Sequence, residues 1–337
     1  MRLLFVKLKH IGDALLLTPT LAAARAAYPK AEIWVVVRKG TEGILAGCPQ
    51  INRILTSTAP EARNRSAFAW WHDLHLLREL RRQRFDYAFE LSHGDRGRLL
   101  VGWSGARLRC ASDGVSRVPR FWRPWFTHLS AHDWRNEHQA EAGFNLVNEF
   151  LPLGMKEPPP LVFDRARTTP CDLGVKLSDY VLIHPGTRWQ RKRWPVERWI
   201  ETGRELLKLV PQLVISVGPD PEEVQLGDTL ATALGPQAFS TRGRLTWAQL
   251  ADLLYGARLF VGVDTAAMHL AAACQCPTVA LFATSVACHW RPWRVPHHLV
   301  GDATTLSEKP PADAMPLIQP DEVLSACREL LSDRPAR

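Results

Sequence analysis

Short apolar runs alternate with segments of helical periodicity along the first half of the chain. A short apolar run bounded by polar residues is typical of a buried strand, whereas apolar positions three and four apart indicate a helix. These patterns predict strands at residues 2–7, 33–37, 51–55, 86–91 and 106–111, and helices at 14–27, 74–83 and 138–150. Alternation of this kind predicts a parallel sheet with right-handed crossover connections.

The second half repeats the pattern. It predicts strands at 180–184, 213–217, 259–263 and 278–281, and helices at 196–209, 222–234, 247–255, 265–273 and 321–331. Prolines between Pro152 and Pro170 indicate a linker. We therefore expect an α/β protein with two doubly wound, Rossmann-like domains, residues 1–165 and 166–337, facing each other across a central cleft. The last helix is free to pack back on the first domain.

Residues 112–135 interrupt the periodic pattern. Arginine, tryptophan, phenylalanine and proline dominate this stretch. A long irregular segment inside a compact domain is uncommon unless it binds something or is disordered. We expect a long functional loop here.

Composition excludes several classes of protein. The 337 residues are 46% hydrophobic, enough material for two buried cores. No apolar run approaches the roughly 18 residues of a membrane span, and the first residues lack the features of a signal peptide. Seven cysteines without framework spacing predict free thiols in a reducing cytosol.

The net charge of +8 is carried entirely by the first half. Residues 1–165 hold 24 Lys and Arg against 16 Asp and Glu, whereas residues 166–337 hold 18 of each. A one-sided basic field points to an anionic partner, such as a phosphorylated lipid, an acidic sugar or a nucleic acid. A solvated basic face explains the charge equally well.

Gly12 and Asp13 follow the first predicted strand and precede a helix. This junction, at the carboxyl end of a strand, is where open α/β sheets bind ligands. Asp13 could accept a proton from a substrate hydroxyl. From its position alone, a helix cap is the stronger interpretation.

A cationic segment, residues 184–195, follows the first predicted strand of the second half. Gly186, Thr187 and Lys192 offer backbone N–H groups, a hydroxyl and an ammonium, which together suit a phosphate. The spacing is not that of a P-loop. Phosphate binding is the favoured interpretation over a solvated charge run.

Asp264, Thr265 and Ala266 form a second strand-to-helix junction in this half. Small residues there let a diphosphate approach the helix N-terminus. His269, on the same helix, either reaches the ligand or contacts only its neighbours. Glu222, after another strand, suits a ribose diol or a helix N-terminus.

Two absences limit the chemistry. The sequence has no Asp-x-Asp pair to bridge a metal to a diphosphate, and no G-x-G-x-x-G fingerprint opens a helix. A metal site and a dehydrogenase are therefore not expected. A bound diphosphate would be neutralised by Lys192, its arginine neighbours and helix N-termini.

These segments together resemble glycosyltransferase family 9, the heptosyltransferases of lipopolysaccharide core synthesis. The matching segments occur in family order across nearly the whole chain, at residues 12–19, 192–195 and 264–269. Residues 126–129 and 289–293 are most similar to the branch that adds a side heptose, heptosyltransferase III. The resemblance implies a GT-B fold, an acceptor-binding first domain and a donor-binding second domain. It also implies inverting, metal-independent transfer from ADP-L-glycero-D-manno-heptose, with no cofactor.

The resemblance also implies roles for individual residues. Asp13 matches the general base, which reverses the preference for a cap, and Gly12 lies beside it in the acceptor half. Lys192 matches the donor-phosphate lysine. Further donor contacts are implied for Gly186, Thr187, Glu222, Asp264, Thr265, Ala266 and His269. Many family members have glycine in place of Ala266.

The expected partners are a nucleotide sugar and a lipid A-linked inner-core oligosaccharide. Arg117, Arg120 and Arg123, interleaved with Trp122 and Trp125, are candidates for contact with this anionic acceptor. The aromatic residues either stack on sugar, lie at the membrane interface or pack within the loop. A lipid-linked acceptor implies a cytoplasmic enzyme, peripheral at the inner membrane.

Three other functions remain open. One is a family 9 transferase for another nucleotide sugar or acceptor. Another is a non-catalytic nucleotide-binding protein whose basic half holds a polyanion. A nucleic-acid binder is disfavoured, because no recognised binding module is present.

Overall fold

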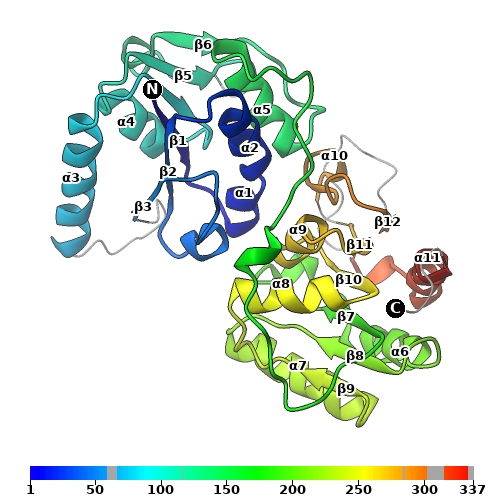
Figure 1. Ribbon diagram of the computed structural model, residues 1–337. Coiled ribbons are helices and arrows are strands. Elements are labelled where there is room, and N and C mark those ends of the chain that lie inside the picture. The colour runs from blue at the N-terminus through cyan, green and yellow to red at the C-terminus, as the bar shows by residue number, and fades with distance from the viewer. Residues whose placement is uncertain (59–66, 116, 284, 302–314, 333–337) are drawn as a thin grey trace. The chain divides into compact units, whose positions relative to one another are not determined.

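The computed structural model describes residues 1–58, 67–115, 117–283, 285–301 and 315–332, with side chains in the third helix described from Trp71 onward. The chain divides into two compact units, Met1–Pro160 and Leu161–Arg337. This division falls slightly before the boundary predicted at residues 165 and 166. Each unit contains a six-stranded sheet (Figure 1).

The first unit is a doubly wound sheet. Its strands follow the order β3-β2-β1-β4-β5-β6, and every neighbouring pair is parallel. Helices α3 and α4 cover one face and α1, α2 and α5 the other (Figure 1). The strands are β1 (Arg2–Lys7), β2 (Glu32–Arg38), β3 (Arg53–Ser57), β4 (Tyr87–Glu90), β5 (Leu108–Ser112) and β6 (His128–Ser130). The helices are α1 (Ile11–Leu15), α2 (Thr18–Ala27), α3 (Ala67–Arg82), α4 (Asp95–Trp103) and α5 (Gln139–Phe150).

Strand β1 lies at the centre of this sheet because its side chains are apolar on both faces. Phe5 pairs in register with Val35 of β2 on one side and Phe89 of β4 on the other. The rings of Phe5 and Phe89 stack with centroids 5.4 Å apart. A strand buried on both faces is typical of parallel sheets covered by helices.

The second unit repeats the same topology. Its order, β12-β11-β10-β7-β8-β9, is that of the first sheet with β7 in the place of β1. Helices α6, α7 and α11 share one core, and α8 and α9 pack together elsewhere on the sheet. The strands are β7 (Tyr180–His184), β8 (Gln212–Ile215), β9 (Ala238–Ser240), β10 (Leu259–Val263), β11 (Thr278–Leu281) and β12 (His297–Val300). The helices are α6 (Val196–Leu206), α7 (Pro221–Leu234), α8 (Trp247–Gly256), α9 (Ala266–Ala273), α10 (Ala287–Trp290) and α11 (Pro320–Ser332).

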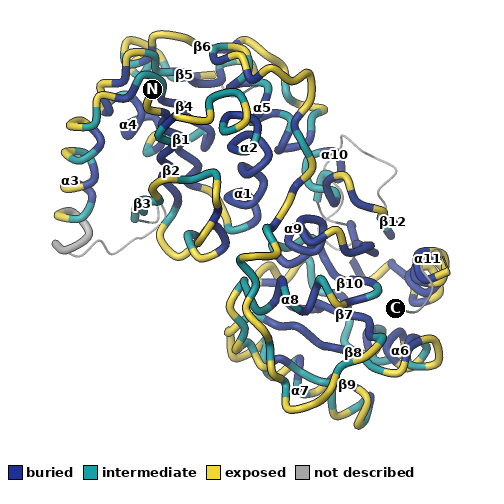
Figure 2. The backbone as a smooth tube through the Cα atoms, viewed as in Figure 1, coloured by how far each residue is buried: buried dark blue, intermediate teal, exposed yellow. Residues whose placement is uncertain are grey.

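The predicted α/β class, with two doubly wound parallel sheets, is confirmed. Figure 2 shows why the strands were recognisable: the central strands of both sheets are buried. All seven cysteines are free; six are buried and Cys171 is half-buried.

Three local predictions need correction. The helix predicted at 14–27 is two helices, α1 and α2, and Pro19 lies in the first turn of the second. Helix α4 was not predicted. The segment 112–135 is not wholly irregular, because it contains the edge strand β6 and a short 3₁₀ turn, Arg123–Trp125. The last helix, α11, buries its apolar side in the core of the second unit.

Candidate functional site

Each sheet has a topological switch point, where successive connections leave in opposite directions. It lies between β1 and β4 in the first unit and between β7 and β10 in the second. Ligands of doubly wound proteins bind beyond the carboxyl ends of the strands at such points. Most of the candidate residues follow these strands.

Asp13 is the third residue of α1, just beyond the end of β1. Its Oδ2 accepts the backbone N–H of His10 at 3.1 Å, so the predicted capping contact is present. Its Oδ1 lies 4.0 Å from the Nζ of Lys7. Gly12 lies within the same helix and is buried, not in a preceding turn as predicted. Asp13 thus caps the helix with one oxygen and has the other beside a cation.

Lys7 is a candidate residue that the sequence analysis missed. It is the last residue of β1 and is buried with Asp13. Burial lowers the pKa of Lys7, and the negative charge of Asp13 opposes this shift. A lysine at the end of an otherwise apolar strand was the signal in the sequence.

A buried carboxylate, Glu90, ends the neighbouring strand β4. It accepts the backbone N–H groups of Ser92 at 2.8 Å and His93 at 3.1 Å. Burial raises the pKa of Glu90 despite these hydrogen bonds. Gly97 faces this carboxylate so closely that a Cβ there would overlap Glu90 Oε1.

His93 adopts an unusual backbone conformation at the same switch point. Its φ of 57° lies in the left-handed region, which side chains other than glycine rarely adopt. Its ring stacks on Trp134 with centroids 4.9 Å apart. Burial lowers the pKa of His93 to about 3, so the ring is neutral at pH 7.

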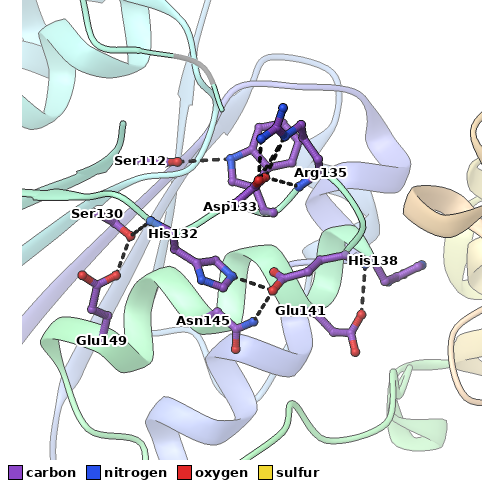
Figure 3. Close-up of polar contacts among 11 residues, drawn as sticks. Ser112, Ser130, His132, Asp133, Arg135, His138, Glu141, Asn145 and Glu149 are labelled. Atoms are coloured by element: carbon purple, nitrogen blue, oxygen red, sulfur yellow. Dashed lines mark hydrogen bonds and ion pairs between the residues drawn. The ribbon is translucent and has the colours of Figure 1, made fainter. Parts of the chain in front are cut away.

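The polar network shown in Figure 3 fixes the segment after β6. Ser130 donates to Glu149 of α5, and His132 Nε2 lies 2.5 Å from Glu137 Oε1. Trp134 Nε1 donates to Ser112 Oγ at 3.1 Å. A small cavity of about 10 Å³ lies between this network and the strand ends, lined by residues that include Lys7, His93, Ser112, Ser130, His132, Trp134 and Gln139. These hydrogen bonds therefore fix polar side chains that line the same cavity as Lys7.

The predicted acceptor arginines lie elsewhere in the first unit. Arg117, Arg120 and Arg123 are exposed, and Arg123 Nη1 pairs with Asp113 Oδ2 at 2.9 Å. No hydrogen bond or ion pair joins the three to Asp13 in the part of the chain that the structure describes.

Trp122 and Trp125, which interleave with these arginines, are half-buried. Their rings meet edge to face with centroids 5.5 Å apart, against the core of the first unit. Trp122 Nε1 also donates to Asp95 Oδ1 at 2.9 Å. Of the three alternatives left open by the sequence, packing within the loop describes these two residues.

In the second unit, the fold brings Lys192 and Asp264 into contact. Lys192 Nζ lies 2.5 Å from Asp264 Oδ2 and 3.3 Å from the Asp264 carbonyl oxygen. His269 Nε2 lies 3.9 Å from Asp264 Oδ1, and both side chains are largely buried. Three predicted donor residues therefore form one cluster at the start of α9.

Thr265 is the N-cap residue of α9, and Ala266 is its first residue. The Thr265 hydroxyl is buried and has no hydrogen-bond partner among the described residues. The helix N-terminus presents unpaired N–H groups and a partial positive charge. The arrangement can bind an anionic oxygen beside Lys192.

Gly186 and Thr187 follow β7, the strand next to β10. Gly186 lies so close to the Glu223 carboxylate that a Cβ at this position would overlap Glu223 Oε2. The same oxygen accepts the Gly218 N–H at 2.8 Å. Thr187 is buried, and its Oγ1 accepts the Trp189 N–H at 3.3 Å.

Glu222 and Glu223 have different environments. The Glu222 side chain is 68% exposed and pairs with Arg193 Nη2 at 2.8 Å. Glu223, which the sequence analysis did not single out, lies against Gly186 and Gly218 at the strand ends. Two adjacent acids at the start of one helix gave no indication of which would face the strands.

His184 ends β7 and is buried. Its Nδ1 lies 3.1 Å from Ser216 Oγ of the loop after β8. Burial lowers the pKa of His184 to about 4, which keeps the ring neutral at pH 7. The neutral ring supports the strand ends beneath Gly186.

Two features are absent from the residues that the structure describes. No group of three or more His, Cys, Asp or Glu side chains within those residues is placed to hold a metal ion. Within the same ranges, no helix combines the length and apolar character needed to cross a membrane.

Related sequences include lipopolysaccharide heptosyltransferases. Lipopolysaccharide heptosyltransferase 3 of Escherichia coli is 29% identical over 291 residues, which cover 84% of this chain and 83% of that protein. Lipopolysaccharide heptosyltransferase 1 of Pseudomonas aeruginosa is 27% identical over 293 residues, covering 84% of this chain and 78% of the relative.

Solved structures share the fold. ADP-heptose lipopolysaccharide heptosyltransferase II of E. coli superimposes with a TM-score of 0.77 at 19% identity, over 99% of both chains. E. coli heptosyltransferase WaaC, solved with ADP, gives 0.79 at 19% identity over 98% of this chain and 100% of the other. The GT-B fold expected from the resemblance is confirmed.

The sequence profile of glycosyltransferase family 9 (heptosyltransferase) matches residues 74–312, most of the chain. The predicted resemblance and the prediction of a glycosyltransferase are both confirmed. The chain therefore belongs to glycosyltransferase family 9.

Proposed function

We propose that this enzyme transfers L-glycero-D-manno-heptose from ADP-heptose to the inner core of lipopolysaccharide. The observation that carries the proposal is the contact of Lys192 with Asp264 at the N-terminus of α9. A largely buried ammonium beside a helix N-terminus suits a diphosphate. Relatives named as lipopolysaccharide heptosyltransferases, and the solved structure of one such enzyme with ADP-2-deoxy-2-fluoro heptose, support the choice of donor and acceptor.

The second unit takes the donor in this proposal. Lys192 and the α9 N-terminus neutralise the diphosphate, and Asp264 and His269 hold the lysine in place. Gly186 and Thr187 line the donor site next to Lys192. Glu222 or its neighbour Glu223 forms hydrogen bonds with the ribose. Charge builds on the diphosphate as the bond to the sugar breaks, so these contacts strengthen in the transition state. We propose that no metal ion is needed.

The first unit takes the acceptor. Asp13 removes the proton from an acceptor hydroxyl, whose oxygen forms a bond to the anomeric carbon as the bond to ADP breaks. A single displacement of this kind inverts the anomeric configuration. Lys7, 4.0 Å from Asp13 Oδ1, places a positive charge beside the carboxylate. Arg117, Arg120 and Arg123 contact acidic groups of the acceptor.

A lipid A-linked acceptor places the proposed reaction at the cytoplasmic face of the inner membrane. The enzyme would then work as a peripheral protein. The excess of positive charge in residues 1–165 supports this proposal, because phosphates make such a surface anionic.

The test is transfer to purified lipopolysaccharides truncated at successive core sugars, with ADP-heptose as donor and EDTA present. Mass spectrometry of the product is the readout. One added heptose on one truncation supports the donor, the acceptor class and metal independence together.

If heptose transfer is not observed, further measurements distinguish the other proposed functions. If no truncation is extended while calorimetry detects ADP binding, the donor sugar is wrong or the protein is non-catalytic. Repeating the assay with other ADP-sugars separates these two cases. Transfer that occurs only without EDTA would contradict metal independence alone.

A further inference from the structure

The first unit exposes large apolar side chains beside arginines. The exposed fractions are 68% for Trp71, 40% for Leu74, 45% for Trp103 and 65% for Phe121. Solvent-exposed apolar clusters of this kind often mark interaction sites. We define the basic aromatic surface as Trp71, Leu74, Arg78 and Arg82 of α3, Trp103 of α4 and Phe121 of the loop after β5.

Helix α3 supplies most of this surface. Its exposed residues Trp71, Leu74 and Arg78 are three and four positions apart, so they share one side of the helix with Arg82. Asp73, Leu76 and Leu80 point to the interior. Figure 2 shows buried and exposed positions alternating along α3 accordingly. The side of the helix that faces solvent is thus apolar at one end and basic at the other.

Contacts connect α3 to the rest of the surface. The Arg81 guanidinium lies against Gly105, in the turn that follows α4. The Trp103 ring of α4 lies 6.5 Å from that of Trp125, centroid to centroid. These contacts join the exposed side of α3 to the end of α4.

The loop after β5 continues the surface. Trp125 packs on Trp122, whose ring centroid lies 5.3 Å from that of Phe121. Phe121 therefore packs on the half-buried Trp122, while its own side chain remains 65% exposed.

The charge around these apolar groups is strongly positive. Residues 78–123 contain eleven arginines and five acidic residues. Of the acidic residues, Glu79 pairs with Arg53, Asp95 with Arg98 and Asp113 with Arg123. No ion pair joins Arg78 or Arg82 to a carboxylate in the described part of the chain.

We infer that the basic aromatic surface docks on an anionic lipid bilayer. Tryptophan and phenylalanine side chains partition into the headgroup region, and arginines beside them bind lipid phosphates. The combination of exposed aromatic side chains with arginines along one side of a helix favours an anionic bilayer over a folded protein partner. The inference takes from the proposed function only that the acceptor is lipid-linked, and it uses none of the residues assigned to transfer.

The test is co-sedimentation of the full-length protein with lipopolysaccharide-free vesicles. Wild type should bind vesicles containing phosphatidylglycerol and leave pure phosphatidylcholine vesicles unbound. In the double variant R78Q/R82Q, we expect a partition coefficient lower by about fivefold per arginine. The variant W71S/F121S should lose at least about tenfold, because both rings leave water on binding.

Two matched variants on the second unit serve as controls. R204Q removes an exposed arginine, and L317S removes a leucine that is 72% exposed. Both should bind vesicles like wild type. Thermal unfolding checks that every variant is folded.

Several outcomes would overturn the inference. One is equal binding of the wild type to both vesicle types. Another is binding at the wild-type level by both double variants. A third is a loss of vesicle binding in the controls as large as that in the double variants. Binding of a deacylated core oligosaccharide through Arg78 and Arg82, without vesicle binding, would assign the surface to the acceptor instead. Transfer to the deacylated acceptor is measured separately and tests the proposed function, which can fail while vesicle binding persists.

Discussion

Lys7 and Asp13 form a buried ion pair at the carboxyl end of β1, with Lys7 Nζ 4.0 Å from Asp13 Oδ1. The two residues come from consecutive elements, the last position of a strand and the first turn of a helix. Because both are buried, each charge depends on the other for compensation. The pair connects the stability of the first unit to the charge of the proposed base.

Replacing Lys7 with methionine should therefore destabilise the protein and slow transfer. The variant leaves the Asp13 carboxylate buried without its cation, which we expect to cost about 3 kcal/mol of unfolding free energy. Urea unfolding measures this loss. Lys208→Met is the control, since the Lys208 side chain, just beyond the end of α6, is 69% exposed and pairs with Glu205. Equal stability of Lys7→Met and wild type would show that the pair contributes nothing.

Asp13→Asn should lower the turnover number by a factor of about 10²–10⁴, the usual contribution of a general base. The amide oxygen of asparagine can still accept the His10 N–H, so the helix cap is retained. ADP affinity, measured by calorimetry, should not change, because the proposed donor residues belong to the second unit. Asp133→Asn, at an exposed ion pair with Arg135, controls for loss of a carboxylate. Wild-type turnover in Asp13→Asn would exclude the assigned role.

Lys192→Met should lower kcat/KM by a factor of about 10²–10³, because the diphosphate loses its charge partner in the transition state. Lys192→Arg retains the charge and should recover part of this loss. Steady-state kinetics with ADP-heptose gives the comparison. An unchanged ADP affinity and an unchanged rate would both speak against a phosphate contact at Lys192.

Gly186→Ala tests the packing of the strand ends. The added methyl group must displace the Glu223 carboxylate, which then loses its hydrogen bond to the Gly218 N–H. We expect a loss of about 2 kcal/mol, the cost of one charge-assisted hydrogen bond.

A double-mutant cycle makes this prediction specific. In the background of Glu223→Ala, Gly186→Ala should cost little further, because the obstructing carboxylate is gone. Urea unfolding of the four proteins gives the coupling free energy. Additive losses would mean that Gly186 is constrained by something other than Glu223.

The lowered pKa of His184 should make the folded protein less stable in acid. Its pKa is about 4 in the folded chain, compared with 6.5 for an ordinary histidine, because burial disfavours the charged ring. The unfolded chain takes up a proton below about pH 6.5, and the folded chain only below about pH 4. Stability should therefore fall as the pH drops from about 6.5 to about 4, by up to about 3 kcal/mol for this group.

His184→Gln should remove part of this pH dependence of stability. Some should remain, because burial also lowers the pKa of His93. Urea midpoints at pH 7 and pH 4.5 measure the change. His75→Gln, on the exposed side of α3, is the control. An identical fall with pH in wild type and His184→Gln would remove His184 as its source.

The central strands were predictable because both of their faces are buried. Strands β1, β2, β7, β10 and β11 consist mainly of apolar residues in short runs, as is typical of strands covered by helices on both faces. The edge strands β6, β9 and β12 have only three or four residues and mixed polarity, which gives no recognisable pattern. Helix α4 was hidden by its two glycines, Gly97 and Gly102, which normally weaken a helix.

The candidate site was predictable where a small or charged residue lies a few residues beyond the end of a strand. Asp13, Gly186 and Asp264 satisfy that rule, and the fold places Asp264 against Lys192, 72 residues earlier. Lys7 and Glu223 were missed because their roles depend on orientation. Which of two adjacent helix residues faces a strand end follows from packing, which the sequence pattern does not encode.

Cys171 has a practical consequence for studying this protein. Since the other six thiols are buried, an alkylating reagent meets one accessible cysteine in the native chain. A fluorophore could thus be attached at one known position without any mutagenesis. Cys171 borders a pocket of about 630 Å³ with Phe239, Thr241 and Arg244 in the second unit, so the label would report on ligand titrations from the proposed donor half.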